Sequence, residues 1–264
     1  MNNNKYTVLA HGGAGSNNDY SDGTQQAASK CLEAIDEGES LANAVGQAVA
    51  VLENDSRFNA GLGSHLRRDG SAQMDAAIMD SAGNFGAVAA IEGYKNPIHI
   101  AQAISKTQYR VLVGPGAAKF AGERGFETLD LKNIPGTGKD FSTTDTVGCV
   151  AYDGENFACG LSTGGIKDAH PGRVGDVPLI GCGLYAGPQG ALAATGSGEA
   201  ITTNLTAYRA YQLIEQGMGP EKILEKALTW FDPSEAFGLL IITREGFAGG
   251  ANRTMAWSVA STKS

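Results

Sequence analysis

The sequence lacks the features of a membrane or secreted protein. No apolar run reaches the about 18 residues that a membrane-spanning helix requires, and the first apolar segment, Tyr6 to Ala10, is too short for the core of a signal peptide. The four cysteines have neither C-x-x-C spacing nor the spacing of a zinc site. We therefore expect a cytoplasmic protein whose thiols are free and buried. These cysteines are Cys31, Cys149, Cys159 and Cys182.

Basic charge and histidine are also scarce. The chain has 20 Lys and Arg against 28 Asp and Glu, a formal net charge of −8, which argues against binding to nucleic acid or to an anionic membrane. None of the four histidines lies at motif spacing from an acid and a nucleophile, so neither a Ser-His-Asp enzyme nor a zinc site is supported. The glycine-rich segment Gly12 to Gly15 follows neither the Rossmann nor the P-loop spacing.

Glycine, in contrast, is abundant. The chain has 37 glycines in 264 residues, about twice the usual share of ~7%, and they show no collagen-like period. We interpret them as tight turns and as sites lined by backbone. At this length the chain can bury a core as one domain or as two tightly joined halves, and no repeat or second domain is visible in the sequence.

The apolar patterns predict strands and helices in alternation. Two hairpin-rich β regions, each flanked by helices, fit an α+β fold of four αββα layers, and residues 125–144 are the most linker-like segment. The predicted strands are 6–11, 73–80, 85–91, 111–113, 146–152, 156–161, 190–195, 237–243, 246–250 and 255–260. The predicted helices are 24–52 (divided near Gly38), 97–106, 116–124, 199–216 and 220–231.

Thr146 begins the central predicted hairpin, which returns to the polar loop Ser162-Thr163-Gly164-Gly165. If the Asp145–Thr146 bond breaks, Thr146 carries both its hydroxyl and a free α-amine. Such an amine has a pKa of about 7.7–8.0, so it can act as the base for its own hydroxyl near neutral pH. The alternative is an ordinary β-forming residue at a strand start.

Four motifs occur in order: His11 to Gly15, the hairpin with its polar loop, Gly172 to Asp176, and Ala194 to Glu199. Together they resemble the isoaspartyl peptidase/plant-type L-asparaginase family of N-terminal-nucleophile (Ntn) hydrolases, from about Tyr6 to Ala260. The resemblance implies a four-layer Ntn sandwich and a single domain over 1–264, which self-cleavage divides into 1–145 and 146–264. It also implies a homodimer of the cleaved units.

The resemblance assigns catalytic roles to Thr146, Thr163, Thr195 and Gly196. Thr146 would be the nucleophile, and Thr163 would hydrogen-bond and tune it. The Thr195 hydroxyl and the Gly196 amide would form the oxyanion hole. Capping of a loop remains the alternative role for Thr163, and Glu199 is expected to be a charge at a helix N-terminus.

The substrate-binding residues implied by the resemblance are Asn59, Arg173, Asp176 and Gly198. A guanidinium can bind the α-carboxylate of an amino acid, and the carboxylate of Asp176 can bind its α-ammonium. Asn59 would face the site, and Gly198 would contribute its backbone. The alternative for Arg173 and Asp176 is a surface ion pair of little energetic value. The family usually has Ser after this Asp, where this chain has Val177.

The loop 53–63 is the expected site of a bound cation. The resemblance implies a structural Na⁺ held by backbone carbonyls, whereas the chemistry itself would require no cofactor. The alternative is an ordinary loop at the end of a helix, because backbone ligation leaves little signature in side chains. The carbonyls would be those of Leu52, Glu53, Asp55, Phe58, Ala60 and Leu62.

We therefore predict a self-cleaving amidohydrolase that acts on L-asparagine and on β-aspartyl dipeptides, with small molecules rather than nucleic acid or membranes as partners. One rival is a glycosylasparaginase, which shares the Asp145-Thr146 junction, although no Trp follows the first strand here. A second rival is a threonine aspartase, whose long linker is missing. A third is a non-catalytic binding module that kept the fold and lost self-cleavage.

Overall fold

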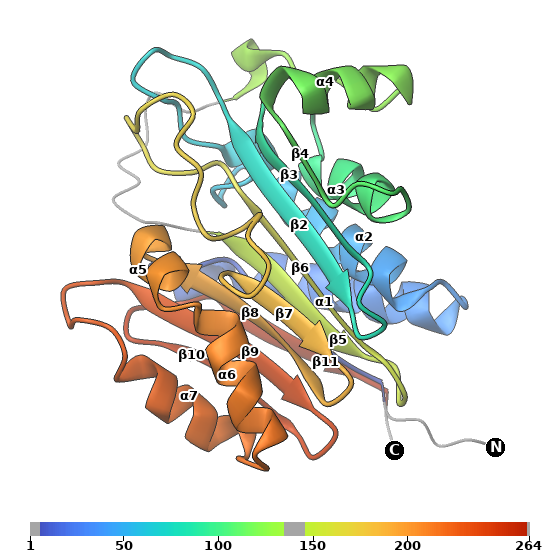
Figure 1. Ribbon diagram of the computed structural model, residues 1–264, viewed down its shortest axis with the longest axis vertical. Coiled ribbons are helices and arrows are strands. Elements are labelled where there is room, and N and C mark those ends of the chain that lie inside the picture. The colour runs from blue at the N-terminus through green and yellow to red at the C-terminus, as the bar shows by residue number, and fades with distance from the viewer. Residues whose placement is uncertain (1–5, 135–145, 263–264) are drawn as a thin grey trace.

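The larger of two β-sheets contains the strand that Thr146 precedes. The computed structural model describes residues 6–134 and 146–262, and among these residues seven strands form this sheet in the order β11-β1-β5-β6-β2-β3-β4 (Figure 1). All neighbours are antiparallel except β3 and β4. The strands are β1 (Thr7–His11), β2 (Met74–Asp80), β3 (Phe85–Ile91), β4 (Val111–Val113), β5 (Val147–Tyr152), β6 (Phe157–Thr163) and β11 (Trp257–Ser261).

A smaller sheet packs against the larger one. Its order in the described residues is β10-β9-β8-β7, and every neighbouring pair is antiparallel. Strands β7 and β8 contact β6, and β8 also contacts β5, so the two sheets lie face to face. The strands are β7 (Leu184–Gly187), β8 (Gly190–Gly196), β9 (Phe237–Thr243) and β10 (Phe247–Ala251).

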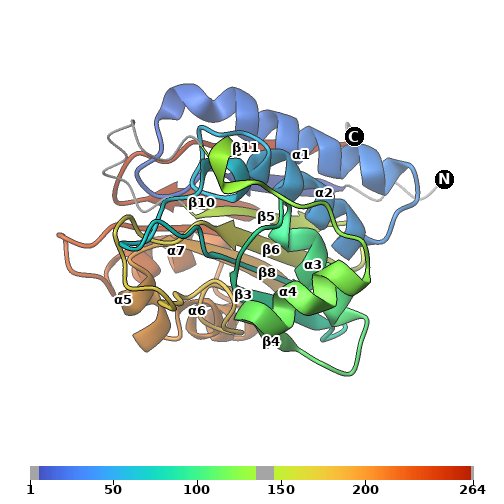
Figure 2. The same ribbon diagram turned by 90° about the horizontal axis from the view of Figure 1, so that it is seen from above.

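Helices cover both outer faces of this pair of sheets, as Figure 2 shows. The larger sheet is covered by α1 (Ser21–Asp36), α2 (Leu41–Glu53), α3 (Pro97–Ser105) and α4 (Gly114–Glu123). The smaller sheet is covered by α5 (Gly198–Thr203), α6 (Thr206–Glu215) and α7 (Pro220–Leu228). Short 3₁₀ turns lie at Asn18–Tyr20, Gly61–Gly63 and Leu131–Asn133. The predicted α+β sandwich with four αββα layers is confirmed.

Three apolar layers hold the sandwich together. One lies between α1–α4 and the larger sheet, one between the two sheets, and one between the smaller sheet and its helices. The middle layer contains residues such as Leu9, Val150 and Leu240 from three strands that alternate between the two faces of their sheets. Burial of these apolar surfaces is the main force that stabilises the arrangement.

The larger sheet interleaves the two parts of the chain that the predicted cleavage would separate. Strands β5 and β6 come from after residue 146, yet β5 pairs with β1 and β6 pairs with β2, which both come from before it. The predicted linker over 125–144 lies only partly in the described residues, and Asp145 lies outside them.

One prediction about secondary structure is wrong, and one strand was missed. The single helix predicted over 199–216 is divided into α5 and α6, because Leu205 adopts a left-handed conformation with φ of 47° that no helix interior accommodates. Strand β7 was not predicted at all. Its sequence, Leu184 to Gly187, is short and ends in glycine, and the strand is stabilised by pairing with β8 rather than by a β pattern of its own.

Among the helices that the structure describes, none has the length and apolar character that crossing a membrane requires.

We predict that Gly86→Ala destabilises the fold, because a β-carbon there would collide with the backbone of Ala101 and Ser105 in α3. Forcing an atom into such a contact costs about 1–3 kcal/mol of unfolding free energy. Gly116→Ala in α4 is the matched control, since its β-carbon would meet no atom within 4 Å. Helical Gly→Ala changes of this kind stabilise by about 0.4–1 kcal/mol. Denaturant unfolding of both variants tests the difference, and equal effects would contradict the packing argument.

Candidate active site

A small cavity lies at the start of β5, where loops from both sheets meet. In the uncut chain its volume is about 10 Å³, roughly the room that one water molecule needs. The predicted catalytic and substrate-binding residues all line it, except Thr195 and Asn59. Its lining consists of Thr146, Thr163, Gly165, Ile166, Arg173, Gly175, Asp176, Gly196 and Gly198. The fold thus brings together residues from three of the four sequence motifs.

Thr146 is buried, with 5% of its surface exposed. Its carbonyl accepts a hydrogen bond from the hydroxyl of Thr195 at 3.4 Å, and that hydroxyl oxygen accepts one from the amide of Ala14 at 3.1 Å. The glycine-rich loop after β1 is therefore linked to Thr146 through Thr195. Gly196 follows with φ of 131°, and a β-carbon there would collide with the carbonyl of Ala236. The two predicted oxyanion donors lie beside the predicted nucleophile.

Thr163 ends β6 and lines the same small cavity. Its hydroxyl oxygen accepts a hydrogen bond from the amide of Gly165 at 3.1 Å, which is the loop-capping contact considered above. Within residues 6–134 and 146–262 the structure shows no hydrogen bond between the Thr163 and Thr146 hydroxyls. The tuning role of Thr163 stays a prediction for the cleaved protein.

Asn59 is hydrogen-bonded to the polar loop 162–165. Its side-chain amide donates to the carbonyl of Gly165 at 2.7 Å, and its side-chain oxygen accepts from the amide of His65 at 3.1 Å. The side chain is buried, and it is not among the residues that line the small cavity. It therefore holds the cavity wall in this structure, and its predicted contact with substrate is untested.

Arg173 and Asp176 meet at Gly198. A β-carbon on Gly198 would lie 2.7 Å from Arg173 Nη2 and 3.0 Å from Asp176 Oδ1, so only glycine leaves both charged groups in place. The guanidinium also donates two hydrogen bonds to the carboxylate of Glu199, at 2.9 and 2.7 Å. Glu199 does lie in the first turn of α5 as expected, but its pairing with Arg173 was missed.

Asp176 is well suited to bind an ammonium group. It is 3% exposed, and burial raises the pKa of its carboxyl from 3.8 to about 7, although nearby Arg173 opposes the shift. Its Oδ2 atom is buried and has no hydrogen-bond partner among the described residues. A buried, unpaired acceptor is costly, and a bound cationic group would offset that cost.

Sequence reasoning missed two charged residues beneath the small cavity, Arg67 and Asp75. Arg67 is only 2% exposed and donates to the carbonyls of Gln73 and Arg173, at 2.9 and 3.3 Å. Asp75 pairs in register with Thr163, and burial raises its pKa to about 6 while the charge of Arg67 lowers it. No motif marks either residue. The only signal was a carboxylate inside an apolar predicted strand.

His11 lies fully buried at the end of β1, opposite Gly148 of β5. A β-carbon on Gly148 would collide with the imidazole, so glycine is required for this packing. Burial lowers the pKa of His11 to about 3. The ring is therefore neutral near pH 7, and such a weak base is poorly matched to proton transfer at that pH.

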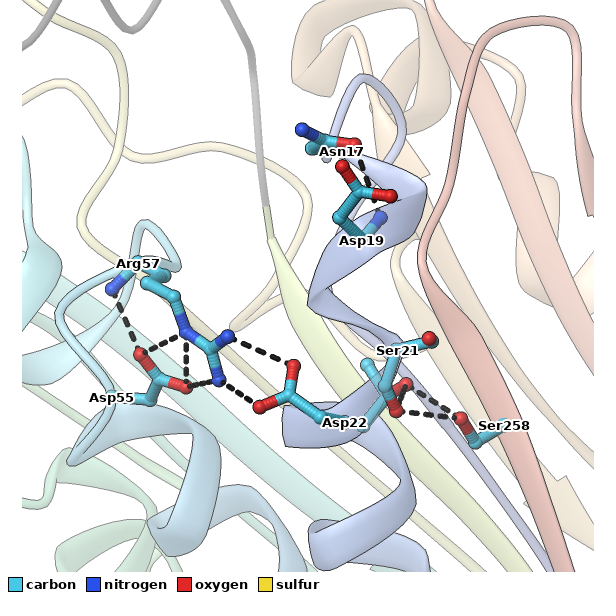
Figure 3. Close-up of polar contacts among 8 residues, drawn as sticks. Asn17, Asp19, Ser21, Asp22, Asp55, Arg57 and Ser258 are labelled. Carbon is cyan, nitrogen blue, oxygen red and sulfur yellow. Dashed lines mark hydrogen bonds and ion pairs between the residues drawn. The ribbon is translucent and has the colours of Figure 1, made fainter.

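The loop that was expected to bind a cation is clamped to α1. Arg57 donates to both Asp55, in the loop, and Asp22, in α1, at distances of 2.6 to 3.0 Å (Figure 3). The bidentate geometry is the strong form of this interaction. The clamp fixes the backbone of the loop without using its carbonyl oxygens.

The backbone of this loop offers carbonyl oxygens to the predicted cation, whose binding stays a prediction. A β-carbon on Gly61 would collide with the carbonyl oxygen of Glu53, and one on Gly63 with that of Phe58. Glycine at these two positions lets the backbone pass close to these carbonyls, and we call this part of the loop the carbonyl cradle. Carbonyl oxygens are the kind of ligand that can replace the water shell of a monovalent cation. The predicted carbonyls of Asp55, Phe58 and Ala60 each accept one backbone amide in the structure, and each of them has a second lone pair for a cation. The carbonyl of Leu52 already accepts the amides of Asn54 and Asp55.

The sequence matches the family model described as Asparaginase over residues 4–139 and 135–264. The chain belongs to the asparaginase family. Its relatives include a plant-type L-asparaginase of Pyrococcus furiosus, 34% identical over 97% of this chain and 96% of the relative. An isoaspartyl peptidase/L-asparaginase of Xenopus laevis is 35% identical over 96% and 92%, and one of Mus musculus is 35% identical over 95% and 86%.

Membership of the asparaginase family confirms the resemblance on which the site was predicted, and with it the class of enzyme, a hydrolase. The family match covers both parts of the chain around Thr146. The individual roles of the site residues remain predictions, because the match concerns the chain as a whole.

We predict that Asp176→Asn makes this asparaginase-family protein more stable than wild type near pH 7 and alters it little near pH 4. The folded pKa of Asp176, about 7, lies above its ordinary 3.8. The free energy of unfolding of the wild type is therefore highest below pH 4, where the carboxyl is protonated in both the folded and the unfolded state. It falls as the pH rises from 4 through 7, because the unfolded state loses its proton more readily than the folded state. Three pH units at 1.36 kcal/mol each set an upper limit of about 4 kcal/mol for the gain.

Thermal unfolding between pH 4 and 8 measures this difference. Asp36→Asn, at the exposed end of α1, is the control and should follow the wild type at every pH. A difference for Asp176→Asn that is constant with pH would contradict the assigned titration.

Proposed function

We propose that this protein is a self-cleaving threonine amidohydrolase. Its substrates would be L-asparagine, giving L-aspartate and ammonia, and the isopeptide bond of β-aspartyl dipeptides. The observation that carries the proposal is the shared lining of the small cavity, which combines Thr146 with the charged pair Arg173 and Asp176. The names of the relatives, L-asparaginase and isoaspartyl peptidase, support the same two substrates.

Self-cleavage would come first. The Thr146 hydroxyl attacks the carbonyl carbon of Asp145, and the acyl group moves from the Thr146 nitrogen to its oxygen. This shift breaks the peptide bond and frees the α-amine of Thr146. Water then hydrolyses the ester, which frees the carboxyl of Asp145 and regenerates the Thr146 hydroxyl. The buried position of Thr146, its backbone held by Thr195, supports this step.

Substrate hydrolysis would use the same hydroxyl with the new α-amine as its base. The oxygen attacks the side-chain amide carbon of the substrate, and its proton passes through the amine to the leaving nitrogen. Water then hydrolyses the β-aspartyl ester. The Thr195 hydroxyl and the Gly196 amide would stabilise the negative oxygen, and one such donor is typically worth about 2.7–4 kcal/mol in the transition state.

The charged residues would bind the amino-acid end of the substrate. Arg173 binds its α-carboxylate, Asp176 its α-ammonium, and Gly198 lets both approach. The unpaired Oδ2 of Asp176 supports this role. Glu199, which now pairs with Arg173, would orient the guanidinium from outside.

The two cleavage products would stay together as one domain. Strands of 1–145 and 146–264 are interleaved in the larger sheet, so separating them would break three strand pairings, β11–β1, β1–β5 and β6–β2, and the apolar layers on both faces. We further propose the cytoplasm as the compartment, supported by four buried free thiols.

A dimer of cleaved units is the proposed assembly. Exposed apolar side chains support it, since the described surface carries Leu179 and Ile180 next to Leu205 and Tyr208, joined through a hydrogen bond from the Tyr208 amide to the Gly181 carbonyl. Apolar groups of this kind mark interaction surfaces on soluble proteins.

Among the rivals, a glycosylasparaginase receives no support from the cavity. The two tryptophans, Trp230 and Trp257, do not line it. The other rival is a non-catalytic binding module. It differs from the proposed enzyme in a measurable way, because only the enzyme cuts its own chain.

We expect purified protein to convert on incubation into fragments 1–145 and 146–264, detected by intact mass, and then to release ammonia from L-asparagine. Thr146→Ala should remain one chain of 27.2 kDa without activity, because it has no nucleophile. Ser81→Ala, in the turn between β2 and β3, is a control that should cleave normally. A wild-type chain that stays intact and inactive would favour the binding module.

For the cation we expect Na⁺ or K⁺, added as chloride in place of choline chloride, to raise the melting temperature. A ligand at 100 times its dissociation constant stabilises by about 2.7 kcal/mol. In Gly63→Ala the added β-carbon would occupy the carbonyl cradle, so the cation-dependent increment should vanish, whereas Gly116→Ala should retain it. Equal melting temperatures in sodium and choline would show that the loop binds no cation.

A further inference from the structure

A second and much larger cavity adjoins the small one. Its volume is about 560 Å³, and it is bounded by Ala14–Gly15, the start of α5, residues 234–236 and residues 253–254. We call it the large cavity. Ile166 lines both cavities, and the segment from 196 to 199 separates them, because Gly196 and Gly198 line the small cavity while Ser197 and Glu199 line the large one.

The wall between the two cavities carries the groups nearest to the reacting atoms. Ala14, on the large side, donates to the Thr195 hydroxyl, which donates to the carbonyl of Thr146 on the small side. Gly15 donates to the carbonyl of Thr254 at 2.6 Å, which ties the glycine-rich loop to the opposite wall. A substrate carbonyl held at Thr195 and Gly196 would therefore lie at the boundary of the two cavities.

An amide substrate has an acyl side and a leaving side. The small cavity holds the charged pair that suits the amino-acid end of the acyl side, so the leaving nitrogen must point across the boundary. Ammonia needs no further room, but an amino acid leaving from a β-aspartyl dipeptide does. Only the large cavity, of the two, has that room.

The charges of the large cavity suit a leaving group with a carboxylate. The Arg253 guanidinium donates to the carbonyls of Pro233 and Ser234, at 2.7 and 3.2 Å, which fixes its position. It forms no ion pair with the residues that the structure describes. Glu199 is already paired with Arg173, so Glu235 is the remaining acidic residue of this lining.

We propose that the large cavity binds the leaving residue of β-aspartyl dipeptides and that Arg253 binds the α-carboxylate of that residue. This inference rests on the proposed function. It makes Arg253 a residue that distinguishes dipeptides from L-asparagine, since L-asparagine places nothing in the large cavity.

The test compares three substrates on fully cleaved protein: L-asparagine, β-aspartyl-leucine and the C-terminal amide of β-aspartyl-leucine. An exposed charge pair is worth up to about 1 kcal/mol, so Arg253→Gln should lower kcat/KM for β-aspartyl-leucine about fivefold. The same variant should leave L-asparagine and the amide within about twofold, because neither presents the carboxylate. Arg244→Gln, in the turn between β9 and β10, is the matched control and should change none of the three.

A second variant tests the cavity itself. Thr254→Trp would fill part of it, and the Thr254 side chain makes no hydrogen bond with the described residues. We expect this variant to have a lower kcat/KM for β-aspartyl-leucine, because its KM for the dipeptide is higher. Its kcat/KM for L-asparagine should stay that of the wild type.

Two results would overturn the inference. In the first, Arg253→Gln lowers kcat/KM equally for all three substrates, so Arg253 only holds the segment 233–234. In the second, the wild type hydrolyses the dipeptide, and neither variant changes the ratio of kcat/KM for the dipeptide to kcat/KM for L-asparagine. The leaving residue then lies elsewhere. A cleaved wild type that hydrolyses none of the substrates is distinguishable from both, because the proposed function itself then fails.

Discussion

Strand β5 is held on every side, and the site depends on that constraint. Its edges are hydrogen-bonded to β1 and β6, α2 packs on one face, and β8 packs on the other. Thr146 directly precedes this strand, so its backbone is fixed by elements from both parts of the chain. If the chain is cut before Thr146 as proposed, this residue becomes a chain terminus, and termini usually fray. Here the sheet supplies the order that the cut chain would lose.

The site buries charged side chains, which lowers the free energy of unfolding. Arg67, Asp75 and Asp176 are almost inaccessible to water, and burial raises the pKa of both carboxyls. Buried ionisable groups are weak contributors to stability, and clusters with shifted pKa values are typical of functional sites. The apolar layers of the sandwich provide the stability that allows this arrangement. The charges, in turn, support the proposed binding of a ligand with both an ammonium and a carboxylate in the small cavity.

Glycine explains how so many groups approach one another. Gly198 lets Arg173 and Asp176 meet, and Gly148 makes room for the imidazole of His11. Where a β-carbon would displace backbone or charged atoms, no other residue permits the same packing. The abundance of glycine in the composition thus reflects close approach of backbone to functional groups as well as turns.

Much of the fold was predictable because its signals are local. Apolar patterns located most strands and helices, and a threonine before an apolar strand, with its glycine-rich motifs, indicated the family and the lining of the small cavity. The residues that the sequence did not reveal act through contacts between distant segments. Arg67 contacts the backbone of Arg173, Arg173 pairs with Glu199, and strand β7 exists only by pairing with β8. Those contacts form only when the layers pack, because burial and register, rather than local pattern, decide which side chains meet.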